Sequence, residues 1–262
     1  MPQTCQKSQS REAYMNTRRN FLEFAAAGLL APGSIWCRSD DWRTELMEAQ
    51  RNQNPLTLGR ILPPPDDVVW EEVDRILGRA PGPEAAPVDV AEYFLTSVPA
   101  KFQQAWPESD SLHPTLANPL IVRLFLSTHT VPAGDTTAWC GAFVNWCLTR
   151  ATIRGTQSAS SQSFATWGSP VWTAEQGGLP TTAKRGDLAV FRQLSNPAHG
   201  HVAFYVRLDP IRANRVLVLG GNQLTRLNGS KLHVIDVDSL RVDSASDLEL
   251  IAIRTKEGLR RA

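Results

Sequence analysis

The sequence predicts an α+β fold in which helices come first and an antiparallel sheet follows. Two observations carry this prediction. Apolar residues recur at helical spacing up to residue 167, whereas after Gly186 they alternate along short segments separated by turn residues. Helices that precede the strands, instead of alternating with them, are typical of an α+β domain.

Four helices are predicted in the first part of the fold, at residues 88–97, 118–128, 140–150 and 160–167. The third is the most regular, because one apolar stripe runs along it through Cys140, Phe143, Val144, Cys147 and Leu148. A further short helix is expected after Asp66 and Asp67, with one apolar face that docks on the body of the protein.

Five strands are predicted after these helices, at residues 187–192, 200–207, 215–219, 231–236 and 248–254. Turn-forming residues separate them, which is the pattern of short antiparallel strands. The third strand is expected to end in the sequence Gly220-Gly221-Asn222.

The composition excludes several classes of protein. A chain of 262 residues is close to one large domain or two small ones, and 42% apolar with 20% charged residues is an ordinary globular mixture. With 27 basic and 26 acidic side chains the net charge is +1, so no nucleic-acid partner is expected. No apolar run reaches the ~18 residues of a membrane-spanning helix, so no stable membrane span is expected either.

Residues 1–40 have the parts of an export signal. Arg18 and Arg19 precede Phe21 and a modest apolar stretch, which resembles a twin-arginine translocation signal. The protein is therefore expected to be exported, to the periplasm by that route, with Met15 as an alternative start. The other interpretation is an amphipathic helix with surface arginines. On this division, residues 41–87 form a helical segment with a proline-rich linker, and residues 88–262 form the main domain.

Cys140 is the candidate nucleophile. It lies in the first turn of the predicted helix 140–150, where backbone N–H groups and the helix dipole stabilise a thiolate. The alternative is a small buried hydrophobe on the same stripe. Cys147 lies mid-helix and is expected to be inert core, and at about 10 Å along the helix axis the two cysteines are too far apart for a disulfide.

His201 is the candidate base, because it opens a predicted strand that can pack across a helix N-terminus. The alternative is a histidine that is merely satisfied at a sheet edge. A base imidazole is usually oriented by a third polar group. Asn222, at the end of the next strand, is the first candidate for that role, and Gln223 and Asp187 are its rivals.

A metal site is the other chemistry that these histidines suggest. His199 and His201 flank Gly200, but no second pair of ligands accompanies them. Neither a metal nor another cofactor is therefore expected.

Five blocks of sequence carry a resemblance to a known superfamily: Trp139-Cys140-Gly-Ala-Phe-Val-Asn-Trp-Cys-Leu, Gly155-Thr-Gln-Ser-Ala-Ser-Ser, Arg185-Gly-Asp-Leu-Ala-Val-Phe, Gly200-His201-Val-Ala-Phe-Tyr-Val and Leu219-Gly-Gly-Asn222-Gln. Their order and spacing over residues 88–254 resemble the NlpC-like and CHAP (cysteine, histidine-dependent amidohydrolase/peptidase) superfamily. The resemblance implies a papain-like fold, in which the nucleophile helix packs on the antiparallel sheet.

The resemblance also implies site residues. Cys140 matches the family nucleophile, His201 its base, and Asn222 the third polar position. Gly220 stands where CHAP members often carry an acidic residue, which leaves the orienting role to an amide.

The expected function is that of an exported cysteine hydrolase that cleaves amide bonds in peptidoglycan peptides. The Cys140 thiolate would attack the amide carbon, His201 would protonate the departing amine, and a helix-start N–H near Cys140 would stabilise the oxyanion. Two alternatives stay open: a non-catalytic exported cell-wall binding module of the same fold, and a Cys-His acyl transferase or deamidase. The oligomeric state is left unassigned.

Overall fold

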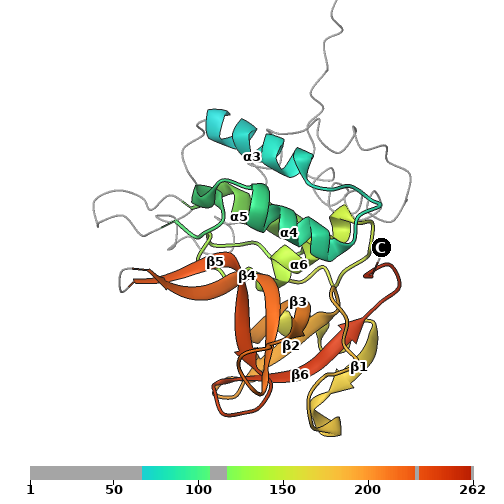
Figure 1. Cartoon of the computed structure of the whole chain (residues 1–262). Helices are drawn as coiled ribbons and strands as arrows, with labels where there is room; N and C mark the ends of the chain where they lie inside the picture. The colour runs from blue at the N-terminus through green and yellow to red at the C-terminus, as the bar shows by residue number, and fades with distance from the viewer. Residues whose placement is uncertain (1–66, 107–116, 228–229, 261–262) are drawn as a thin grey trace, which may run out of the picture. The chain divides into compact units, whose positions relative to one another are not determined.

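The described helices gather on one side of a six-stranded antiparallel sheet (Figure 1). This computed structural model describes residues 67–106, 117–227 and 230–260. The strand order is β1-β6-β2-β3-β4-β5. The predicted class, α+β with helices before strands, is confirmed. The expected export signal and the first part of the segment 41–87 lie outside the described residues.

The helices occur close to where the sequence predicts them: α3 (Asp67–Arg79), α4 (Pro87–Ser97), α5 (Pro119–Leu124) and α6 (Cys140–Arg150). α5 is shorter than predicted, because the chain tightens into the 3-10 turn η3 (Phe125–Ser127). The predicted helix 160–167 is wrong in kind: this segment contains only the 3-10 turn η4 (Ser161–Phe164). None of the described helices is long and apolar enough to cross a membrane.

Three strands agree with the prediction to within one residue at each end: β2 (Leu188–Gln193), β3 (Gly200–Leu208) and β6 (Leu248–Thr255). The next two are much longer than predicted, β4 (Arg215–Leu227) and β5 (Ser230–Arg241), because β4 continues through Gly220-Gly221-Asn222 instead of turning there. β1 (Ser169–Thr173) has no counterpart in the predicted pattern, since its side chains do not alternate between exposed and buried.

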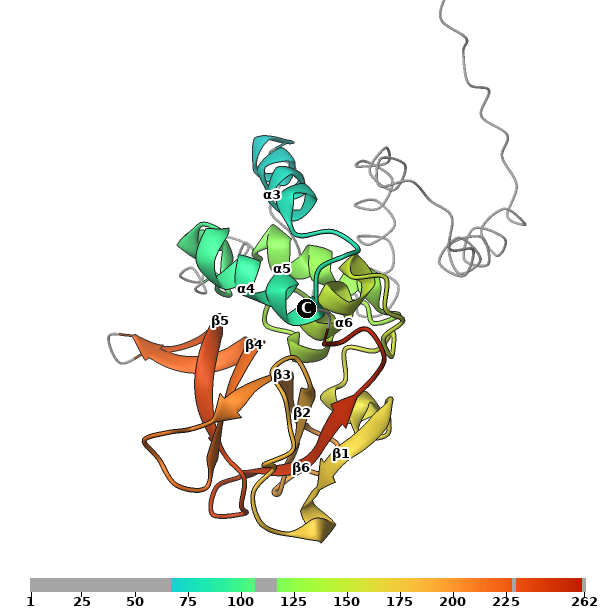
Figure 2. The same cartoon turned by 45° about the vertical axis from the view of Figure 1, so that its right-hand side comes forward.

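Aromatic side chains pack the helical layer together. The Phe94 ring in α4 meets Phe143 and Trp146 of α6 edge to face, with centroids 5.4 and 5.2 Å apart. α6 in turn packs against β3 and β4 (Figure 2). The N-terminus of α6, where Cys140 lies, is therefore held beside the strand that begins at Gly200.

Helix α3 docks on this body, as its apolar face predicts. The Arg150 guanidinium, at the end of α6, donates to the carbonyls of Gly78 and Ala80 at 3.1 and 2.7 Å. The Tyr93 hydroxyl donates to the Ile76 carbonyl at 2.7 Å. These donors satisfy carbonyls that the end of a helix would otherwise leave unpaired, so they fix α3 against α4 and α6.

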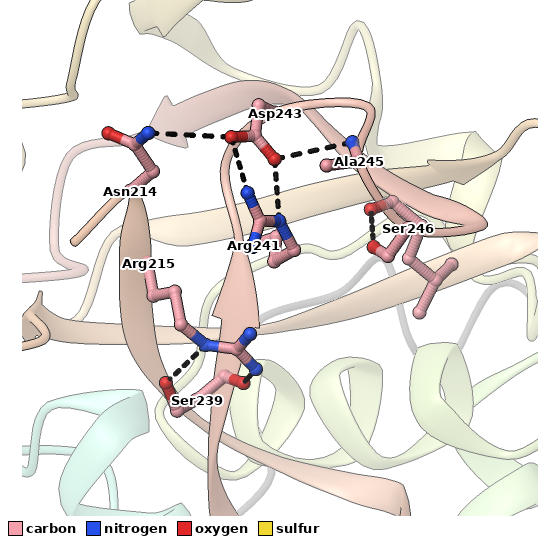
Figure 3. A network of polar contacts seen from close by, with 8 residues as sticks. Asn214, Arg215, Ser239, Arg241, Asp243, Ala245 and Ser246 are labelled. Atoms are coloured by element: carbon pink, nitrogen blue, oxygen red, sulfur yellow. Dashed lines mark hydrogen bonds and ion pairs between the residues drawn. The ribbon is translucent and has the colours of Figure 1, made fainter. Parts of the chain in front are cut away.

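A polar network lies where β4 starts and β5 ends (Figure 3). Arg241 and Asp243 form a two-pronged ion pair at 2.7 and 2.8 Å, and Asp243 also accepts from the Ala245 backbone N–H. In the adjacent strand the Arg215 guanidinium binds both the hydroxyl and the carbonyl of Ser239. The network fixes this end of the β4–β5 hairpin.

Candidate active site

The N-terminal turn of α6 presents Cys140 in a buried position. The side chain is 2% exposed. Backbone N–H groups of Val202 and of Gly141 lie near enough to its sulfur to lower the pKa of the thiol, against the larger effect of burial. Val202 directly follows His201, so the sulfur and the imidazole belong to one site. The two candidates therefore lie close together, on α6 and on the strand that packs against it.

Strand pairing explains why the Val202 N–H is open to the sulfur. The Gln193 N–H donates to the His199 carbonyl at 3.0 Å, which fixes the alternation of the β2–β3 ladder. In that alternation the Val202 N–H points away from β2, toward β4. However, β4 pairs with β3 only from the Phe204–Leu219 pair onward. The Val202 N–H is therefore available to the Cys140 thiol, whose pKa it lowers.

His201, at the start of β3, is also buried. It is 6% exposed, and its Nε2 has no hydrogen-bond partner among the described residues. Its ring lies 6.3 Å from that of Phe191, its partner residue on β2. A buried, unpartnered imidazole nitrogen is costly in a purely structural residue, and it leaves this nitrogen able to exchange a proton.

Gln223 is the amide whose side chain influences the imidazole of His201. A side-chain hydrogen bond with Gln223 raises the pKa of His201. Gln223 is 3% exposed, and its Nε2 also donates to the Val218 carbonyl at 3.4 Å. The sequence pattern favours Asn222 over Gln223 for this position, whereas the structure favours Gln223.

A β-bulge causes this reversal. The β4–β5 register shifts by one between the Gly220–Asp236 and Gln223–Val234 pairs, so β4 holds one extra residue there. Asn222 sits inside the bulge with a positive φ of 62°. Regular pairing beyond Phe204–Leu219 would have set residue 222 opposite His201, and the extra residue moves Gln223 into that position.

Close backbone contacts hold the bulge against the start of α6. A Cβ at Gly221 would collide with the ring carbons of Trp139 and Phe143, and one at Gly220 would come within 2.8 Å of the Ala203 Cβ. Trp139 is fully buried directly before Cys140. The two glycines are therefore required for close approach, which brings β4 and the start of α6 together.

The other rival, Asp187, has a structural role. Its carboxylate is fully buried and forms two bonds with the Arg260 guanidinium, at 2.7 and 2.6 Å. It also accepts from the Lys184 backbone N–H. These hydrogen bonds occupy both carboxylate oxygens of Asp187. They link the end of the described chain to the start of β2, away from His201.

Burial decides the charge state of the site. Desolvation raises the pKa of the Cys140 thiol, and the backbone N–H groups offset only part of this rise. Desolvation also lowers the pKa of His201 from 6.5 to about 4, against the opposing bond with Gln223. The expectation of a resting thiolate is therefore not met: at neutral pH the free site holds a neutral thiol beside a neutral imidazole.

One known protein family matches the part of the chain that contains this site. Residues 132–222 match the family model of the CHAP domain. This part of the chain is therefore similar to the CHAP domain. The match starts in the loop before α6 and includes Cys140 and His201, while Gln223 lies just beyond its end. Searches of curated proteins and of solved structures gave no significant match.

The CHAP domain connects the chain in general terms with amidase or peptidase activity on peptidoglycan. Both cysteines in the described part of the chain are free thiols, and Cys147 is fully buried mid-helix. In the same described part, no group of three His, Cys, Asp or Glu side chains is arranged to hold a metal ion. The groups available for this chemistry at the described site are therefore the Cys140 thiol, the His201 imidazole and the Gln223 amide.

Proposed function

We propose that the protein is a cysteine hydrolase that cleaves amide bonds in peptidoglycan peptides, with Cys140 as nucleophile, His201 as base and Gln223 as the residue that orients the imidazole. One observation carries the proposal: the backbone N–H of Val202, the residue after His201, lies near enough to the Cys140 sulfur to lower the pKa of its thiol. A nucleophile and a base have to be this close to exchange a proton.

The neutral resting site defines the first step. His201 accepts the thiol proton as the sulfur forms its bond to the amide carbon, so charge develops only during the attack. The tetrahedral oxyanion lies near the N-terminus of α6, where the first N–H groups have no partner within the helix. The imidazolium then gives its proton to the amine as the C–N bond breaks, which leaves a thioester on Cys140.

The second step regenerates the enzyme. His201 takes a proton from water, the hydroxide oxygen bonds to the thioester carbon, and the carboxylic acid leaves as Cys140 recovers its proton. Gln223 is neutral, so it holds the ring without the countercharge that a carboxylate would supply. Because Cys140 is 2% exposed, substrate binding has to widen access to the sulfur before attack.

Export is part of the proposal. The twin-arginine-like sequence at Arg18 and Arg19 would carry the folded enzyme to the periplasm, where peptidoglycan is its substrate. On this proposal residues 1–40 act as the signal, 41–87 as a helical segment and linker, and 88–262 as the hydrolase domain. Fractionation of cells that express the chain with Arg18→Lys and Arg19→Lys tests it: the double variant should stay in the cytoplasm.

Digestion of purified cell-wall sacculi tests the catalytic proposal. Cys140→Ala should abolish release of peptide fragments with little change in melting temperature, because only the sulfur is removed. Cys147→Ala is the matched control and should retain activity, since Cys147 is buried in the middle of α6, two turns away from Cys140. Equal fragment release by wild type and Cys140→Ala would favour the non-catalytic binding module of the same fold.

A further inference from the structure

One segment contacts the backbone beside both candidate catalytic residues. We call residues 155–164 the brace. The Asn145 side chain of α6 fixes its first half: Nδ2 donates to the Ser158 carbonyl at 2.9 Å, and Oδ1 accepts from the Gln157 N–H at 3.0 Å. At Gly141, the residue after Cys140, an added Cβ would collide with the Ala159 carbonyl. The brace therefore lies directly against the first turn of α6.

The second half of the brace reaches the strand that carries His201. Gln162 Nε2 donates to the Phe191 carbonyl at 2.8 Å. Phe191 pairs with His201 and lies two residues along β2 from the Gln193–His199 hydrogen bond, so Phe191 and His201 are themselves a hydrogen-bonded pair. The carbonyl that binds the backbone N–H of His201 is thus the one that Gln162 also binds.

Gly200 shows how closely these groups fit. A Cβ at this position, immediately before His201, would collide with both the Phe191 carbonyl and Gln162 Nε2. Gln162 therefore fills the space that a side chain at residue 200 would need. Its amide fixes the backbone on one side of His201, while the Val202 N–H reaches the Cys140 sulfur on the other.

We propose that Gln162 is a positioning residue for His201, and that the brace sets the separation between Cys140 and His201. This inference rests on the proposed function, in which His201 is the base. It adds how the imidazole ring of His201 is held in position. The Gln162 amide donates to the Phe191 carbonyl and to the Ser161 hydroxyl, so it acts on His201 through the backbone of Phe191. Loss of its bond should let the start of β3 move and let water reach the ring.

An NMR titration of the His201 imidazole in the full chain tests the proposal without any substrate. Gln162→Met keeps the length of the side chain but removes the donor, and Gln162→Ala serves as a second variant if methionine does not fit. Gln103→Met is the matched control, because Gln103 Nε2 donates to two backbone carbonyls, of Leu95 and Val98, on the helical side.

We expect the His201 titration to move upward by about one pH unit or more in the Gln162 variants, since hydration favours the charged ring, and to stay in place in Gln103→Met. Activity on peptidoglycan fragments should show kcat about 10-fold lower with KM within about twofold. A titration that stays at the wild-type position in folded Gln162 variants overturns the proposal. A wild-type protein that cleaves no fragment overturns the proposed function instead, and the titration still decides the role of Gln162.

Discussion

Gln223 and Asn222 are neighbours in the chain but have different surroundings, which makes them a sharp test of the site. Gln223→Ala removes the amide that acts on His201, so kcat/KM for amide hydrolysis should fall about 10-fold or more. Asn222→Gly is the control, because glycine accepts the positive φ of 62° at that position. It should stay within about threefold of wild type. The reverse order of effects would return the orienting role to Asn222.

The lowered pKa of His201 predicts how stability depends on pH. Because the folded pKa is about 4 and the ordinary value is 6.5, the unfolded chain binds the proton first as the pH falls. The folded state should therefore lose stability as pH drops from 6.5 to 4, by up to about 3 kcal/mol. Urea unfolding at several pH values measures this loss.

His201→Gln provides the control for that titration. A glutamine side chain does not titrate, so the part of the loss that belongs to residue 201 should disappear. If both proteins lose the same free energy of unfolding between pH 6.5 and pH 4, the imidazole is not desolvated as its burial indicates.

At the scale of elements, the bulge in β4 is the feature on which the site depends. Gly221→Ala would push the added methyl into Trp139, and should cost about 1–3 kcal/mol of stability and most of the activity, because the start of α6 is displaced. Gly82→Ala is the matched control, since a Cβ there would meet no atom within 4 Å. Thermal unfolding and fragment release measured on both variants check this. A Gly221→Ala protein as stable and active as Gly82→Ala would contradict it.

The same bulge marks the limit of what the sequence could predict. Periodicity located α6 to the residue, because the apolar stripe through Cys140 and Phe143 is long and regular. In contrast, Gly220-Gly221-Asn222 has the composition of a turn, yet the strand continues through it. The signal for a bulge is tertiary: the glycines are needed because Trp139 packs against them. Because the sequence does not reveal that contact, its pattern favours Asn222 over Gln223 as the residue that orients His201.

At the scale of the whole molecule, the order of helices before strands and the placement of Cys140 and His201 at one site followed from pattern and motif. The charge state of the site did not follow from the sequence. A first-turn cysteine suggests a thiolate, but the side chain is 2% exposed and the cost of desolvation exceeds the stabilisation by backbone N–H groups. Burial of this kind depends on the packing of α6 against β3 and β4, which local sequence does not encode.

A covalent intermediate on Cys140 tests the central claim most directly. Purified full-length protein would be mixed with soluble peptidoglycan peptides, quenched in acid within the first turnover, and digested for mass spectrometry. The account predicts an acyl group in thioester linkage on Cys140, absent from Cys147 and lost in His201→Ala. Peptide cleavage with no acyl group on Cys140, or an unchanged yield of the adduct in His201→Ala, would contradict it.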